Sequence, residues 1–405
     1  MDNLNNVVDP DQYTRVLQEF AESISPEDET YETDLMRVAA FFRTFGAALT
    51  SFLVENGYKG DETDNQCKIE FLKTKFKEKN ISTPRGMEEW FETKKRVERK
   101  TAFQICFAFS LNIEQTNDFF RRVYFERGFD CHCIEEAVYY FCIKNQLCYQ
   151  EAVEMLSSLP KIKQSKIPDG TEILYTGTIV EHIKDITQKE DMLAYLEEHI
   201  DQFGYNNATA AGLVEELWNQ IARDGGVAFK EGQLVGKFDT SDTYVTEEQY
   251  DSEWNVLAQI FGLDKYWHNK FAVNRSIKPV LLDNALIPPL AEASFPDRDA
   301  VNKVLNKMHV SNERMRKLLI LLVFYSYWAK FVVENKDIQY QATKRDAEKC
   351  VFSINKYLLD AGYPELYMGN PYDWIFLWAI NDLYPLMTFR DYMREIFAYK
   401  SENNA

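Results

Sequence analysis

The sequence predicts an all-α fold of multi-helical bundle domains, on three observations. Apolar residues recur at spacings of three and four in many segments of the 405-residue chain, the period of an amphipathic helix. Gly and Pro are sparse, at 16 and 12 residues, which suits long helices better than turn-rich β structure. Residues 318–329 form a run of twelve in which only Ser326 is clearly polar. Such a run is typical of a helix that is buried on all sides.

We expect the apolar run to lie in a central helix over residues 311–335. Ser311 or Asn312 is its expected N-cap, and Glu313 lies in its first turn, where an acidic residue is favourable. The run is shorter than the roughly 20 apolar residues that cross a bilayer, so no membrane partner is expected. The start MDNLNNVVDPD lacks the features of a secretory signal, and the seven cysteines show no paired framework. The expected location is therefore cytoplasmic.

Charge and chain breaks divide the sequence into four parts. Residues 1–34 hold ten acidic residues and one arginine, half of the net charge of −18. We expect an acidic tail at 1–32, an N-terminal helical domain at 33–160, a connecting region at 161–250 and a C-terminal helical domain at 251–400. The tail is either partly ordered or a charge mimic that covers a basic patch. The segment 227–238, which contains two glycines, is expected to form a small β-hairpin or an ordered loop.

The N-terminal domain begins with a predicted helix over 33–56, which Gly57 ends as a left-handed cap. A second helix ends at Asn80. A third helix is expected over 84–93, because Pro84 fits a first helical turn that needs no N–H donor.

A basic segment overlaps these helices. Between Cys67 and Lys100 the chain has eleven basic and six acidic residues, a local net charge of +5. Clustered lysine and arginine neutralise phosphates, so DNA is an expected partner of residues 68–100, although the whole chain is acidic and repels it.

Residues 67–125 also show a distinctive order of features. A helix is followed by the turn NIS, a helix that ends in EWF, a basic linker and the phrase CFAFSLNIEQTNDFF at 106–120. This order resembles phage-repressor-type helix-turn-helix proteins of Firmicutes that have helical C-terminal extensions. The resemblance implies that the helix at 84–93 enters the major groove of DNA. The expected nucleic-acid-binding residues are Lys73, Lys77, Arg85, Lys94, Lys95, Arg96 and Arg99.

The leading hypothesis is thus a non-enzymatic bacterial regulator or accessory protein with a helix-turn-helix-like segment that contacts nucleic acid. The competing hypothesis is a protein-interaction scaffold that binds no nucleic acid. Glu88, Glu89 and Glu92 lie on the presumed reading helix, where phosphates repel them. In either case the C-terminal half is the expected surface for a protein partner or for self-association.

No motif specifies a reaction. The five histidines form no HExxH pattern and no GxSxG sequence occurs, so neither an enzyme nor a cofactor is expected. The triplet Cys131-His132-Cys133 has poor spacing for zinc, which usually takes cysteine pairs two to four residues apart. No metal site is therefore expected.

An internal repeat is a further hypothesis. Residues 113–142 and 352–379 share the order helix, break, helix at an offset of 238 residues, which places Asn117 opposite Asn355. Few residues are identical, and the sequence leaves open whether the two segments are a true repeat.

Overall fold

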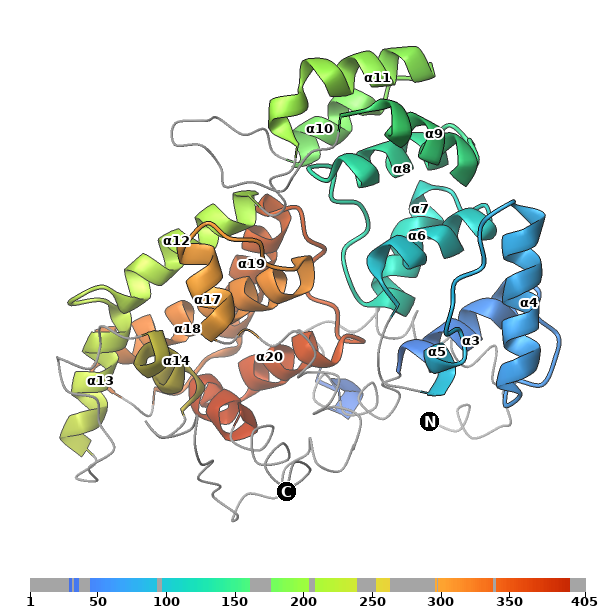
Figure 1. Cartoon of the computed structure of the whole chain (residues 1–405). Helices are drawn as coiled ribbons and strands as arrows, with labels where there is room; N and C mark the ends of the chain where they lie inside the picture. Colours follow the sequence, from blue (N-terminus) through green and yellow to red (C-terminus); the bar gives the residue numbers. More distant parts are fainter. Residues whose placement is uncertain are drawn as a thin grey trace. The chain divides into compact units, whose positions relative to one another are not determined.

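The computed structural model describes residues 29–30, 33–35, 44–92, 97–160, 176–203, 208–238, 253–262, 296, 298–337 and 340–393. Every regular element within these residues is a helix, which confirms the predicted all-α fold (Figure 1). The described residues fall into two compact units. The first contains residues 44–203, and the second contains residues 33–35 together with those from Thr209 onward.

The helices are assigned to the units as follows. The first unit contains α3 (Phe45–Glu55), α4 (Asn65–Glu78), α5 (Glu89–Glu92), α6 (Arg99–Ala108), α7 (Ile113–Phe119), a π-helical turn (Phe120–Tyr124), α8 (Ile134–Lys144), α9 (Tyr149–Ser158), α10 (Thr176–Ile183), α11 (Lys189–Glu198) and a 3-10 turn (Ile200–Gln202). The second contains α12 (Ala208–Ala222), α13 (Val227–Phe238), α14 (Glu253–Phe261), α17 (Arg298–Leu305), α18 (Asn312–Asn335), α19 (Lys344–Asp360), α20 (Pro371–Asn381) and a helix at 385–393. The predicted connecting region, 161–250, therefore supplies helices to both units.

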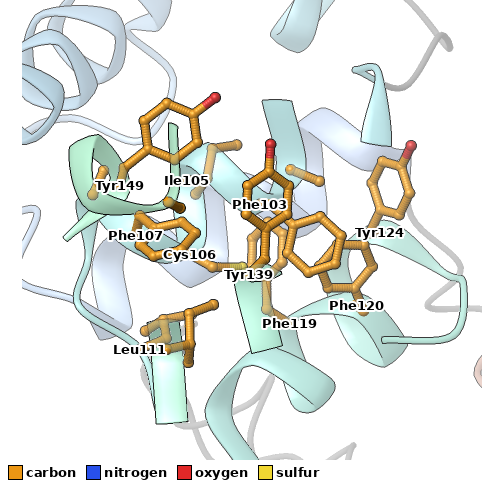
Figure 2. Packing of buried hydrophobic residues seen from close by; sticks show 14 of the residues in the cluster. Phe103, Ile105, Cys106, Phe107, Leu111, Phe119, Phe120, Tyr124, Tyr139 and Tyr149 are labelled. Carbon is orange, nitrogen blue, oxygen red and sulfur yellow. The ribbon is translucent and has the colours of Figure 1, made fainter. Parts of the chain in front are cut away.

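The core of the first unit is an aromatic cluster around α6 (Figure 2). Phe103 and Phe107 are four residues apart, so they lie on one face of the helix. The Phe103 ring centroid is 4.5 Å from that of Phe120 and 5.2 Å from that of Tyr139. The Phe107 ring lies 5.4 Å from that of Tyr149. Helix α6 is thereby fixed between the π-helical turn, α8 and α9, and each buried aromatic side chain stabilises the unit by about 1.5–3 kcal/mol.

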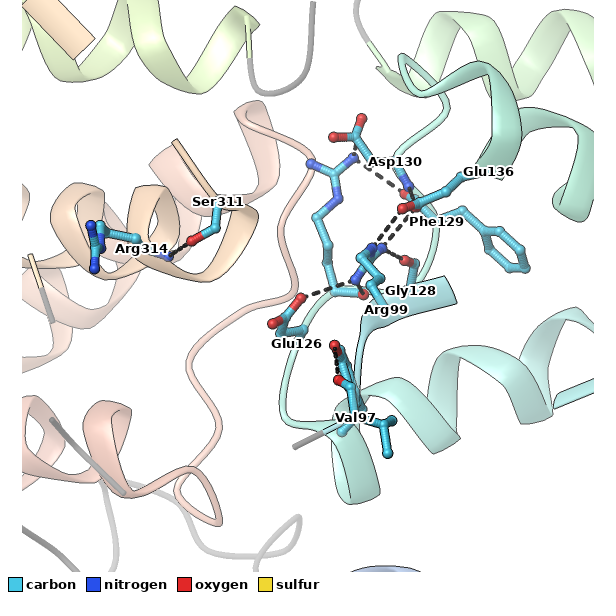
Figure 3. A network of polar contacts seen from close by, with 11 residues as sticks. Val97, Arg99, Glu126, Gly128, Phe129, Asp130, Glu136, Ser311 and Arg314 are labelled. Carbon is cyan, nitrogen blue, oxygen red and sulfur yellow. Dashed lines mark hydrogen bonds and ion pairs between the residues drawn. The ribbon is translucent and has the colours of Figure 1, made fainter. Parts of the chain in front are cut away.

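At one end of α6 the side chain of Arg99 joins three parts of the first unit (Figure 3). Its guanidinium donates to both carboxylate oxygens of Glu136, at 2.6 and 2.8 Å, and to Glu126 at 3.1 Å. It also donates to the backbone carbonyls of Arg127 and Gly128. Glu136 in turn accepts a hydrogen bond from the backbone N–H of Asp130 at 2.6 Å. Burial disfavours the charged guanidinium, but Glu136 and Glu126 outweigh it and raise the pKa of Arg99 above its usual value.

The second unit contains the same arrangement around Arg316. This guanidinium donates to both oxygens of Asp373, at 2.6 and 2.7 Å, and to the carbonyls of Pro364 and Glu365. Asp373 accepts from the backbone N–H of Tyr367 at 2.9 Å. We call each arrangement an arginine clasp: an arginine that is buried (Arg316) or largely buried (Arg99), a carboxylate in the first turn of a later helix, and the loop that precedes this helix.

The carboxylates and loops of the two clasps correspond at an offset of 237, whereas the arginines, Arg99 and Arg316, are 217 residues apart. This offset relates the carboxylates Glu136 and Asp373, and it relates their N–H donors, Asp130 and Tyr367. The same offset relates the two pairs of accepting carbonyls. It also relates the residues with a left-handed backbone that precede each loop, Phe125 (φ 60°) and Gly362 (φ 75°). In each unit, therefore, a first helix runs away from the clasp, a second helix runs back toward it, and a third helix runs away from it again. These are α6, α7 and α8 in the first unit and α18, α19 and α20 in the second.

Helix α18 is the central helix that the apolar run predicts. Its N-cap is Ser311, as expected, and sixteen of its 24 residues are buried. By length and composition alone it could cross a membrane, a test that buried core helices also pass. Lys317, just before the apolar run, is buried, lies 3.2 Å from Glu313 and sits 4.8 Å from the centre of the Tyr372 ring. The helix thus packs within its unit on apolar and charged contacts alike.

The predicted β-hairpin at 227–238 is wrong, because these residues form α13. Ala228 and Glu231, three residues apart, are both buried. Glu231 accepts hydrogen bonds from Tyr325 of α18 at 2.6 Å, from Gln259 of α14 and from Arg390. Burial alone would raise the pKa of Glu231, but Arg390 and these hydrogen bonds hold it below its usual value. Tertiary contacts with a charged residue therefore override the turn tendency of the two glycines.

The predicted helix over 33–56 is interrupted. Thr44 has extended backbone (φ −71°, ψ 162°) and its side chain caps α3 by accepting from the N–H of Ala47. The earlier residues Thr33, Asp34 and Leu35 are helical but belong to the second unit, where the Leu35 carbonyl accepts from the indole of Trp374 at 2.8 Å. Gly57 does have the expected left-handed backbone, with φ 97°.

The clasps should contribute strongly to stability. Asp373→Ala leaves Arg316 buried without its carboxylate, and breaking a buried pair in this way typically costs about 3–5 kcal/mol. We expect a loss of that size in the unfolding free energy of the second unit, measured by urea denaturation with tryptophan fluorescence. The matched control is Asp299→Ala, which removes the exposed contacts to Lys303 and Arg314 and should have a much smaller effect. Equal losses in both variants would contradict a structural role for the clasp.

Candidate functional site

The predicted nucleic-acid-binding residues occupy different environments. Lys77 and Arg85 are exposed, and Lys73 is half-buried on α4. Lys94, Lys95 and Arg96 lie outside the described residues. Phosphate binding by Arg99 stays a prediction, and the contacts weigh against it, because Arg99 is committed to the clasp of the first unit. The sequence does not reveal this role, because the carboxylate partner is 37 residues away.

The expected reading helix over 84–93 is also shorter than predicted. Among the described residues of this range, 84–92, only Glu89–Glu92 are helical, and residues 79–88 separate this turn from α4. Asn80 (φ 55°) ends α4, and the N–H of Ile81 bonds to the Phe76 carbonyl at 2.9 Å. Met87 and Trp90 are buried and fix the following segment to the core. One helical turn held in this way offers little side-chain surface for the major groove.

Three of the four lysines of α4 fall into two classes. Lys73 and Lys75 pair with Glu70 at 2.8 Å and Glu78 at 3.4 Å, and such exposed pairs exchange easily with other anions. Lys68 instead is buried, donates to Thr50 and to the Glu62 carbonyl, and has its pKa lowered by burial. The basic surface of α4 is therefore smaller than the sequence count suggests.

A groove lies at the end of the first unit's helices away from the clasp. Its volume is about 680 Å³, within the range of about 300–1,000 Å³ that is typical of ligand sites. It is lined by the turn between α6 and α7, by the turn between α8 and α9, and by Lys79 at the end of α4. We call it the first-unit groove.

The two turns that form the groove are built in the same way, 36 residues apart. Ser110 and Gln146 both have a left-handed backbone, with φ 53° and 58°. The next residue, Leu111 or Leu147, donates its N–H to the carbonyl five residues back, at 3.0 and 2.8 Å. This is the Schellman helix end, in which the residue after the left-handed one often makes an apolar contact. The sequence signal for the groove is thus the pair FSLNIEQ and NQLCYQE at 109–115 and 145–151.

Each turn leads directly into a capped helix. Asn112 accepts from the N–H of Gln115 and donates its own N–H to the Gln115 side chain. Cys148 donates its N–H to Glu151 at 2.7 Å, and both pairs are capping boxes. Since both ends of each turn are hydrogen-bonded, the walls of the groove are rigid.

The surface of the groove combines apolar side chains with a few charges. Phe107, Leu111 and Ile143 are buried beneath it. Lys79 and Glu114 are exposed at its rim, while Lys144 donates to the Ile186 carbonyl at 3.0 Å. Two lysines against one glutamate give the groove a slight positive charge. Such a surface fits a ligand with an apolar side chain and polar or acidic ends.

Four thiols of the first unit are poorly suited to chemistry. Burial raises the pKa of Cys142 and Cys133 to about 12, and it raises the pKa of Cys106 and Cys131 as well. Nδ1 of His132 lies 3.1 Å from the Gln202 carbonyl. Among the described residues, no group of three or more Cys, His, Asp and Glu side chains could hold a metal ion.

The folded chain should therefore have two reactive thiols. Only Cys67 and Cys148 are exposed among its seven cysteines. We expect brief iodoacetamide treatment at about pH 8 to label these two, because thiolate is the reacting form. The other five should react only after urea unfolding, as mapped by peptide mass spectrometry. Fast labelling of Cys131 or Cys133 in the folded chain would contradict this.

Comparison with protein-family models, curated proteins and solved structures finds no match to the chain. The resemblance of residues 67–125 to phage-repressor-type proteins accordingly stays a prediction. The function has to be argued from the contacts within each unit.

Proposed function

We propose that the chain is a helical scaffold protein and that its first unit binds a segment of another protein in the first-unit groove. The observation that carries this proposal is the groove itself, a hollow of about 680 Å³ with a mixed apolar and polar lining between two hydrogen-bonded turns. Its shape and lining suit recognition of a ligand.

The duplicated architecture supports the same proposal. Proteins built from repeated helix pairs commonly present their binding surfaces on repeated turns and faces. The two arginine clasps show that both units use one helical arrangement. A scaffold can gain a second binding surface by duplicating such a module.

Binding to nucleic acid is the second candidate. It is favoured by Lys73 and Lys77, one turn apart on α4, and by the exposed Arg85. The commitment of Arg99 to the clasp, the short α5 and the net charge of −18 weigh against it. We therefore rank it below the scaffold.

The scaffold proposal can be tested by site-specific photocrosslinking. We expect p-benzoylphenylalanine at Glu114, on the groove rim, to crosslink one discrete protein in extracts of the source organism. The matched control is Glu190, which is also exposed and is also the second residue of a helix in the first unit. The same product from both positions, or no protein product from Glu114, would contradict the proposal.

The second candidate has a separate test. If α4 contacts phosphates, duplex DNA binding measured by fluorescence anisotropy should weaken steeply between about 50 and 200 mM salt. Lys73→Glu with Lys77→Glu should then weaken binding further, while Lys184→Glu, an exposed lysine on another part of the first unit, should weaken it less. Absence of binding at the lower salt concentration would remove this candidate.

A further inference from the structure

The second unit shows what can cover the end of this helical arrangement. Its residues 340–343 lie between α18 and α19 and are not helical. The N–H of Ala342 donates to the carbonyl of Leu383 at 2.8 Å, and the Gln341 side chain donates to the Tyr384 hydroxyl at 2.8 Å. Leu383 and Tyr384 belong to the turn that follows α20. A segment of the chain therefore pairs, through its backbone, with the turn at the end opposite the clasp.

The corresponding turn of the first unit lines the groove. The offset of 237 that relates the two clasps also relates Gln146 to Leu383 and Leu147 to Tyr384. Gln146 and Leu147 both line the first-unit groove. The helices α8 and α20 have the same length, 11 residues, and extend equally far from their clasp carboxylates, so the two turns begin at equivalent positions. Their backbones differ, since Gln146 is left-handed and Asp382, which ends α20, is extended.

The difference between the units is the connection between the first two helices. Helix α18 continues 19 residues beyond Arg316, and residues 336–343 then lead to α19. Helix α6 continues only nine residues beyond Arg99, and 109–112 join it to α7. These four residues already form the end of α6 and the N-cap of α7. They are therefore too few to cover the turn after α8. The groove is found at this place.

We infer that the first-unit groove binds an extended peptide segment, which takes the place that residues 340–343 occupy in the second unit. This inference rests on the proposed scaffold function and specifies its ligand. A backbone N–H of the peptide donates to the Gln146 carbonyl, as Ala342 donates to Leu383. A large apolar or aromatic side chain of the peptide packs on Phe107 and Ile143, which lie beneath the groove.

The second unit also indicates the side chain that suits such a segment. The Tyr340 ring stacks on Phe331 with centroids 4.9 Å apart, and its hydroxyl donates to Asp346 at 3.0 Å. The first-unit groove has exposed or half-exposed polar groups around an apolar floor, including Lys79 and Gln115. A tyrosine in the bound peptide suits this surface, because its ring is apolar like the floor and its hydroxyl is polar like the surrounding groups.

The experiment uses the chain's own segment as the probe. The peptide KDIQYQAT, residues 336–343, is titrated into the full chain with ¹³C-labelled isoleucine methyl groups. We expect a saturable NMR shift of the methyl groups of Ile113 and Ile143, both in the groove, with a Kd below about 1 mM. Replacing the peptide's tyrosine with alanine should weaken binding at least tenfold.

A variant of the groove provides the second arm. Ile113→Glu puts a charge in the groove at the first position of α7, where an acidic residue favours the helix. We expect the Ile143 shift to need at least tenfold more peptide, while Glu190→Arg on α11 leaves it unchanged. The methyl signals of Ile69 and Ile105, buried in the same unit, report whether the variant is folded.

Three results would overturn the inference. The first is the absence of a saturable shift of the Ile143 methyl signal. The second is equal peptide binding by the Ile113→Glu variant. The third is a set of shifts confined to isoleucines of the second unit, such as Ile380, which would mean that the peptide displaces the chain's own segment. If crosslinking from Glu114 succeeds while the peptide causes no shift, the scaffold function stands and the extended-peptide ligand falls. If crosslinking from Glu114 also fails, both fall.

Discussion

Each unit of this protein depends on one buried arginine and its carboxylate. Removing two charges from water is costly, and their attraction offsets that cost only when the geometry is good and the remaining donors are satisfied. Arg99 and Arg316 each bind both oxygens of a carboxylate and two loop carbonyls. Arg99 meets the condition fully, whereas the Nε of Arg316 is buried without a partner among the described residues. The clasp fixes where the later helix begins, and the helix lengths then determine what lies at the other end. The groove of the first unit is thus a consequence of a fixed start and a short connection.

Sequence patterns predicted the elements whose stability is local. The apolar run and Ser311 defined α18, and the left-handed residues Gly57 and Asn80 ended α3 and α4. Patterns failed where a distant partner decides the structure. Residues 227–238 are helical because the buried Glu231 meets Arg390, which is 159 residues away. The groove was missed for a similar reason, since its walls are two turns that become neighbours only when α7 folds back beside α8.

The comparison of the two units supports the proposal that the groove is a binding site more strongly than its shape alone does. One unit fills the position with its own residues 340–343, and the other leaves a hollow of about 680 Å³. One unit covers this site with its own residues and the other leaves it open. The open site is therefore a natural place for a ligand that resembles the covering segment. Backbone pairing would supply affinity, and the apolar floor would supply selectivity, as in other modes of peptide recognition.

The hydrogen bond from the Trp374 indole to the Leu35 carbonyl joins residues that are 339 positions apart. Because both belong to the second unit, that unit is discontinuous, and the described part of the first unit, residues 44–203, lies between its two parts in the sequence. The described part of the first unit is one stretch of sequence, interrupted only by short gaps, and can fold as soon as that stretch has been synthesised. The second must wait for its last helices before it can close on its first residues. Closing a loop of this length costs less when the inserted residues are already compact, so folding of the first unit prepares the second. A fragment that starts at residue 209 would consequently lack part of its own core.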